Sequence, residues 1–145
     1  MLYNCYLRKG VVYVPTVGKM ETGGYREIAP VTVVPVSRDI ELKSALQEAF
    51  SKDNTIVPGL ARAGFPEPVL PKYAGVKSYA AFARGTSVWN VIEDKGVYQI
   101  IGQRKMLPRG WEDDPDQTVT LPAGSTVDDL CSRLIAILQA KAAYP

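Results

Sequence analysis

Four acidic residues lie close together after a tryptophan: Trp111 is followed by Glu112, Asp113, Asp114 and Asp116. Clustered carboxylates can bind a divalent cation, or they can attract a basic protein that the tryptophan then anchors. The spacing does not match a calcium-binding loop. A solvated loop without any ligand is the third possibility, and it is the usual role of a charge run. Of the two functional interpretations, protein binding fits these five residues better, and we expect neither a metal nor a cofactor.

The chain contains no histidine, which removes several kinds of catalytic site. Ser-His-Asp and Cys-His catalysis both need an imidazole base, and two distant cysteines cannot supply the four ligands of a structural zinc site. Cys5 and Cys131 each fall within an apolar pattern, which predicts buried and unreactive thiols. We therefore predict no catalytic residue, although a carboxylate-based, metal-dependent hydrolase remains an alternative.

The composition indicates one globular domain over residues 1–145. Hydrophobic residues make up 46% and charged residues 22%, and a chain of 145 residues can bury a core without disulfides or metals. The net charge of +2 gives no general attraction to nucleic acid. The apolar stretch at the N-terminus is too short for a signal peptide, and no apolar run reaches the roughly 20 residues of a membrane helix. We expect a cytoplasmic protein with no membrane association.

The first half of the sequence predicts strands followed by a helix. Tyr3, Cys5 and Leu7 alternate as on a strand, and residues 11–17 and 25–36 are rich in β-branched and aromatic types. Prolines within these strands predict edges, bulges or short lengths, and Gly23-Gly24 predicts a hairpin turn. Apolar residues at helical spacing predict a helix over about 40–51, capped by Ser37 or Asp39 and closed by a Glu48–Lys52 pair.

The second half predicts a long loop, a hairpin and a final helix. Prolines and glycines over 53–75 favour a long ordered loop, with a short helix over 78–83. Residues 87–93 and 97–105 are predicted to form a hairpin. We expect an acidic loop over residues 107–117 and a strand over residues 118–121. Ser125 and Thr126 begin a helix with a capping box. The order of elements predicts an α+β fold, with a single mostly antiparallel sheet and two main helices packed against it.

A nucleic-acid-binding module is the alternative function that the residues suggest. Arg8, Lys9, Lys19 and Arg26 lie among tyrosines on the N-terminal strands, as on a platform for single-stranded nucleic acid. Only these four basic residues occur over 1–36, however, so we do not expect nucleic acid as the main partner.

Residues 75–141 resemble the immunity proteins of bacterial contact-dependent growth inhibition systems, of the CdiI type. The resemblance is carried by the stretch Lys77-Ser78-Tyr79-Ala80-Ala81-Phe82-Ala83-Arg84-Gly85 and by the hairpin, strand and helix that follow it. It implies a compact α+β domain without catalytic residues. It also implies a one-to-one complex with the C-terminal domain of a cognate toxin, with no homo-oligomer expected.

The resemblance also suggests how such a protein acts. It implies inhibition by blocking the active site of the toxin or the access of its substrate, and many toxins of this family are nucleases. An acidic segment suits such a target, because it can occupy a surface made for phosphates. Inhibitors of nucleases are often strongly acidic, whereas this chain is slightly basic. Either the charge complementarity is local, or the toxin is not a nuclease.

Overall fold

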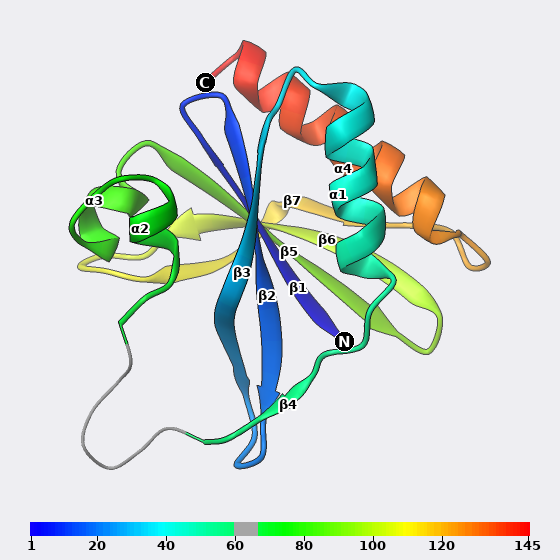
Figure 1. Cartoon of the computed structure of the whole chain (residues 1–145). Helices are drawn as coiled ribbons and strands as arrows, with labels where there is room; N and C mark the ends of the chain where they lie inside the picture. The colour runs from blue at the N-terminus through cyan, green and yellow to red at the C-terminus, as the bar shows by residue number, and fades with distance from the viewer. Residues whose placement is uncertain (60–66) are drawn as a thin grey trace.

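The computed structural model describes residues 1–59 and 67–145, and these form a sheet covered by helices on both faces (Figure 1). The sheet has seven strands, six of them in the order β3-β2-β1-β5-β6-β7, with each neighbouring pair antiparallel. The short seventh strand, β4, pairs with β2 in parallel. The strands are β1 Leu2–Arg8, β2 Val11–Met20, β3 Tyr25–Pro35, β4 Ile56–Val57, β5 Thr86–Asp94, β6 Val97–Lys105 and β7 Trp111–Thr120. The predicted fold class is confirmed.

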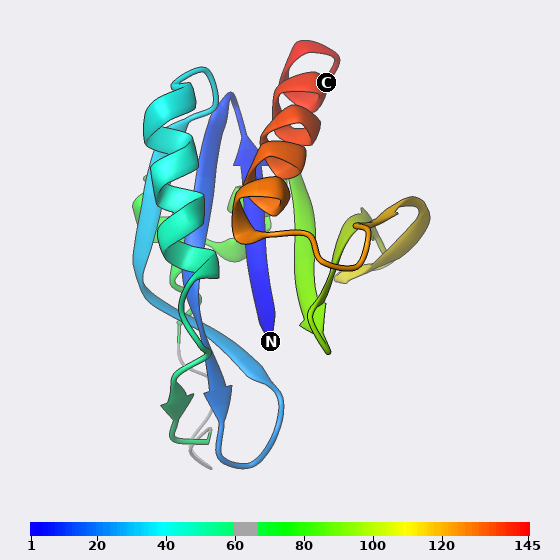
Figure 2. The ribbon, with the colours of Figure 1, turned by 90° about the vertical axis from the view of Figure 1, so that its right-hand side faces the viewer.

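The two long helices, α1 (Asp39–Phe50) and α4 (Val127–Ala143), pack against one face of the sheet (Figure 2). The alternation of β1 sends Cys5 and Leu7 to this face, where they meet the apolar stripes of both helices. The fully buried members of this main core include Cys5, Val12, Leu42, Leu46, Val91, Ile100, Leu130, Cys131, Leu134 and Leu138.

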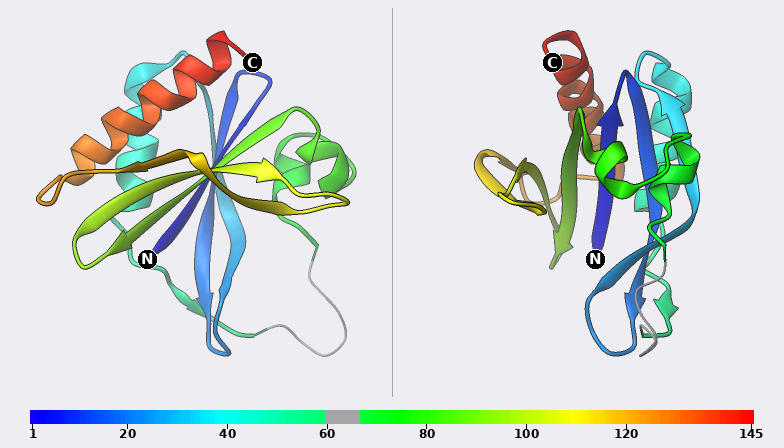
Figure 3. Two further views of the ribbon diagram at one scale, coloured as in Figure 1. Left: turned by 180° about the vertical axis from the view of Figure 1, so that it is seen from behind. Right: turned by 90° about the vertical axis from the view of Figure 1, so that its left-hand side faces the viewer.

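Two short helices, α2 (Leu70–Tyr73) and α3 (Tyr79–Ala83), cover part of the opposite face (Figure 3). A second buried cluster lies beneath them, made of Tyr6, Tyr13, Val31, Leu70, Phe82 and Val88. The predicted loop over 53–75 is therefore wrong in part, because it contains β4 and α2. Residues 60–66 of the predicted loop lie outside the described residues.

The predicted helix cap is present at α4 and absent at α1. Thr126 and Asp129 form the predicted capping box, with N–H to carboxylate and N–H to hydroxyl distances of 2.8 and 3.1 Å. At α1 the N-cap position is Arg38, which makes no side-chain cap, so the expected cap by Ser37 or Asp39 is wrong. The predicted pair of Lys52 and Glu48 is present at 3.0 Å.

The turns and irregular strands also match their prolines and glycines. Lys95 and Gly96 both have positive φ in the tight β5–β6 turn, as a type I′ hairpin requires. The register between β2 and β3 shifts beside Pro15, and β3 is an edge strand of the sheet. Trp89 of β5 is buried in the main core together with Val91, two residues further along the strand.

Candidate interaction surface on the β6–β7 hairpin

The acidic segment is a strand, not the predicted loop. Residues Trp111–Thr120 form β7, which pairs with β6 and leaves only the turn from Met106 to Gly110 between them. Glu112 and Asp113 pair with β6 on one side of this segment, and residues 118–120 pair on the other side. These ladder hydrogen bonds offset the low strand propensity of the aspartates and proline between and beside them. The structure therefore holds the candidate residues Trp111, Glu112, Asp113, Asp114 and Asp116 on one ordered edge strand (Figure 3).

Pairing with β6 places polar partners directly opposite the first two acids. Arg104 donates from Nε to the Glu112 carboxylate at 2.8 Å, and Gln103 donates to Asp113 at 2.8 Å. The Glu112 carboxylate raises the pKa of Arg104 above its ordinary value. Because both members of this ion pair are exposed, it adds little to stability. The negative charge of the strand is thus partly compensated by a base on the neighbouring strand, eight residues earlier in the sequence.

The next acids belong to a four-residue bulge in β7. Ile101 pairs with Thr118 and Gln103 with Asp113, so residues 114–117 stand opposite the single residue Gly102. The Asp114 carboxylate accepts from the Asp116 amide at 3.0 Å and from the Gln117 side chain at 2.8 Å, and these bonds lower its pKa. Asp114 therefore stabilises the bulge. Asp113 and Asp116 are the exposed acids available to a partner.

Trp111 is tied to the helix layer and is only half-exposed. Its Nε1 donates to the hydroxyl of Tyr79 in α3 at 3.2 Å, and the Lys105 ammonium lies 5.7 Å from the ring centroid. The indole also packs against the cluster around Phe82. Trp111 therefore joins the hairpin to α3, in addition to any role as a contact residue.

The turn of this hairpin carries apolar residues that were not predicted as part of the site. Leu107 is 91% exposed and Met106 is 43% exposed. With Pro108 they line a hollow of about 290 Å³ between the turn and α3. The consecutive letters Met-Leu-Pro in a surface turn are a signal that could have identified it, because exposed apolar clusters are typical of interaction sites.

The sequence did not predict a partly buried polar cluster, which lies between β1 and β3. The Glu27 carboxylate on β3 accepts from the Tyr6 hydroxyl at 2.6 Å and from the Asn4 amide at 2.9 Å, both on β1. Burial raises the pKa of Glu27, and the two hydrogen bonds oppose this effect only in part. Nothing in the local sequence pairs Glu27 with Tyr6, since the two residues meet across β2.

We predict that Glu27→Gln removes a pH dependence of stability. A raised pKa in the folded state means that the folded chain binds the proton more tightly than the unfolded chain, so this contribution is present at low pH. It is lost as the pH rises through the folded-state pKa. We compare the free energies of unfolding from urea titrations at pH 4 and pH 7. The variant should be more stable relative to the wild type at pH 7 than at pH 4, by about 1.4 kcal/mol for each tenfold difference in proton affinity between the folded and unfolded states. Glu21→Gln, at an exposed position, is the control and should show no such gain.

Three of the four tyrosines of the N-terminal strands are buried, and Tyr25 at the start of β3 is 40% exposed. Tyr3, Tyr6 and Tyr13 are buried, so their ring faces pack against protein atoms. Tyr3 contacts Phe50 in the main core, while Tyr6 and Tyr13 contact Phe82. Since stacking on bases needs exposed rings, the arrangement does not favour the nucleic-acid alternative.

The two cysteine thiols are buried. Cys5 and Cys131 are free thiols in the main core, and burial raises their pKa to about 12 and about 11. The prediction of buried cysteines is confirmed. Within residues 1–59 and 67–145, no group of three or more acidic or cysteine side chains is placed to hold a metal ion. None of the helices described is both long enough and apolar enough to span a bilayer.

Comparison with known proteins identifies the fold. No family model matches the sequence, and no curated protein matches it. A protein of unknown function from Neisseria meningitidis, NMB0488, superposes with a TM-score of 0.66 and 11% identity, covering 97% of this chain and 93% of that chain. A chain of the CdiA-CT/CdiI toxin and immunity complex from Yersinia pseudotuberculosis superposes with a TM-score of 0.64 and 11% identity, covering 97% and 95%. At this identity the likeness shows a shared fold.

Proposed function

We propose that this chain is an immunity protein of a bacterial contact-dependent growth inhibition system, which acts in the cytoplasm as a single domain. The observation that carries the proposal is the fold shared with a chain of the CdiA-CT/CdiI complex over 97% of this sequence. The resemblance of residues 75–141 to immunity proteins points the same way. The chain binds the C-terminal domain of a cognate toxin one-to-one, without chemistry of its own, and blocks its active site or substrate access.

The proposed contact surface includes the acidic strand with Trp111, Glu112, Asp113, Asp114 and Asp116. The exposed acids there can attract a basic region of a nuclease toxin, and clustered charges of this kind increase the rate of association. Because Arg104 compensates Glu112, the attraction comes mainly from Asp113 and Asp116. The acids therefore act as a local patch on a chain whose net charge is +2.

Co-expression tests this function directly. The tagged chain is expressed with the C-terminal domain of the protein encoded immediately upstream, and the eluate is analysed for a one-to-one complex by size exclusion with light scattering. A stable complex that also suppresses the toxicity of that domain is the expected result. If both proteins fold and no complex forms, the immunity function is excluded for this pair, and binding to nucleic acid is tested next.

We predict that Asp113→Lys with Asp116→Lys slows association with the toxin domain by about tenfold at low salt, with a smaller effect at high salt. Asp114 is left intact because it stabilises the bulge. The control is Glu21→Lys with Asp94→Lys, which makes the same change in net charge in the β2–β3 turn and at the end of β5. Stopped-flow measurements at several salt concentrations give the result. Equal rates and salt dependence for the two double variants would remove the acidic strand from the interface.

A further inference from the structure

The turn between β6 and β7 exposes apolar side chains, and a backbone hydrogen bond holds the turn together. The Met106 amide donates to the Gly110 carbonyl at 3.0 Å, and Gly110 takes a φ of 97°, which favours glycine. Leu107 projects from this turn with 91% of its surface exposed. Because the turn is already ordered, little conformational entropy of the turn is lost when a partner covers Leu107.

The hollow beside the turn has a mainly apolar wall. Its volume is about 290 Å³, and α3 forms the side opposite the turn. Ala80 and Ala83 of α3 leave the space open because their side chains are small, while the bond from Trp111 to Tyr79 holds the two sides together. The hollow is therefore large enough for an apolar side chain and is bounded by elements that are fixed to each other.

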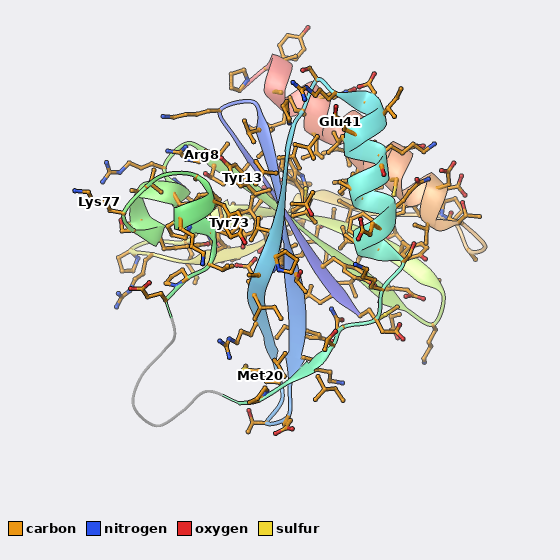
Figure 4. The ribbon with its side chains drawn as sticks, in the orientation of Figure 1. Arg8, Tyr13, Met20, Glu41, Tyr73 and Lys77 are labelled. Atoms are coloured by element: carbon orange, nitrogen blue, oxygen red, sulfur yellow. The ribbon has the colours of Figure 1, made fainter. Side chains whose placement is uncertain are left out.

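The charged residues that line the hollow have one sign. Within the described part of the chain, Lys105 and Arg109 belong to the lining and no carboxylate does. Lys77 and Arg84 flank α3 in the sequence and are exposed. Lys77 extends into solvent beside α2 and α3, on the side of the molecule away from α1 (Figure 4). An apolar centre with a cationic rim is complementary to an apolar side chain that has carboxylates next to it.

We propose that this hollow is the energetic centre of the toxin interface, and that it receives an apolar side chain of the toxin domain flanked by carboxylates. The inference rests on the proposed function and assigns the strongest contact to the turn, with the acidic strand at its margin. Water is excluded from an apolar pocket more completely than from an exposed strand of charges, so the pocket contributes more to slow dissociation. The toxin surface must accordingly carry acids opposite Lys105 and Arg109, and bases opposite Asp113 and Asp116.

The first test places a charge at the centre of the contact. Leu107→Asp should weaken binding of the upstream-encoded toxin domain by about 30-fold or more in calorimetry, mostly through faster dissociation. Ile40→Asp is the matched control, because Ile40 is 87% exposed on α1 and should leave affinity unchanged. Both sites are on the surface, so both variants should melt close to the wild type.

The second test fills the hollow with a larger side chain and reverses a charge at its rim. Ala80→Phe should weaken binding, whereas its control Ala136→Phe on α4 should not. Arg109→Glu should weaken binding, whereas its control Arg133→Glu on α4 should not. Wild-type affinity for Leu107→Asp and Ala80→Phe overturns this inference and leaves the immunity function standing. Tighter binding by Arg109→Glu overturns the acidic character of the partner. If the wild-type chain itself fails to bind, the proposed function and this inference fall together.

Discussion

Replacing Phe82 with alanine is expected to lower the free energy of unfolding by about 3–5 kcal/mol. Phe82 is fully buried, and its ring lies 5.6 Å from Tyr6, 5.5 Å from Tyr13 and 6.1 Å from Tyr79. The substitution leaves a cavity between α3 and the sheet and removes three aromatic contacts. Urea titration followed by circular dichroism measures the loss. Phe82→Leu, which keeps most of the volume, should cost about 1.5 kcal/mol or less.

A variant on the other face of the sheet separates stability from binding. Leu134→Ala removes a fully buried side chain from the main core beneath α4 and should cost about 2–5 kcal/mol. Only Phe82→Ala disturbs α3, which forms one wall of the hollow, so only this variant should also weaken toxin binding when both are fully folded. Equal affinity for the two variants would mean that the position of α3 does not matter to the interface.

Gly102→Ala is expected to destabilise the protein by about 1–3 kcal/mol, although alanine is normally the better residue in a strand. A Cβ at Gly102 would lie 2.5 Å from the Cβ of Gln117 and 3.2 Å from the Gln117 carbonyl oxygen. These atoms belong to the bulge that crosses over Gly102, and they cannot move away as the end of a flexible side chain would. The bulge must therefore shift, together with Asp114 and Asp116, which should be visible in amide chemical shifts.

A double-mutant cycle with Gln117→Gly identifies this contact as the cause. Without the Cβ of Gln117 the shortest clash disappears, so Gly102→Ala should cost clearly less in the Gln117→Gly background. The coupling free energy from urea titration of the four proteins is the decisive quantity. Additive losses would show that Gly102 is needed for another reason than the close approach of the bulge.

The sequence shows which acidic residues belong to the candidate surface, but it does not show their secondary structure or their neighbours in space. The run from Trp111 to Asp116 is visible in the sequence, but Pro115 and the aspartates oppose a strand locally. Pairing with β6 on both sides of the bulge that contains Pro115 overrides that preference, and it brings Arg104 to Glu112. The hollow at Leu107 depends on α3, which comes from a distant part of the chain. No local pattern can report a surface made by two segments that meet only after folding.

The sequence by itself determined the elements whose signals are local. The alternation of β1, the stripe and capping box of α4, and the glycine of the β5–β6 turn each act within a few residues. Only the tertiary structure decided the second layer of α2 and α3, the buried contact of Glu27 with Tyr6, and the strand character of the acidic segment. Each of these depends on backbone pairing or burial between different elements of the fold. The free energy of that pairing or burial is greater than the local preference it opposes.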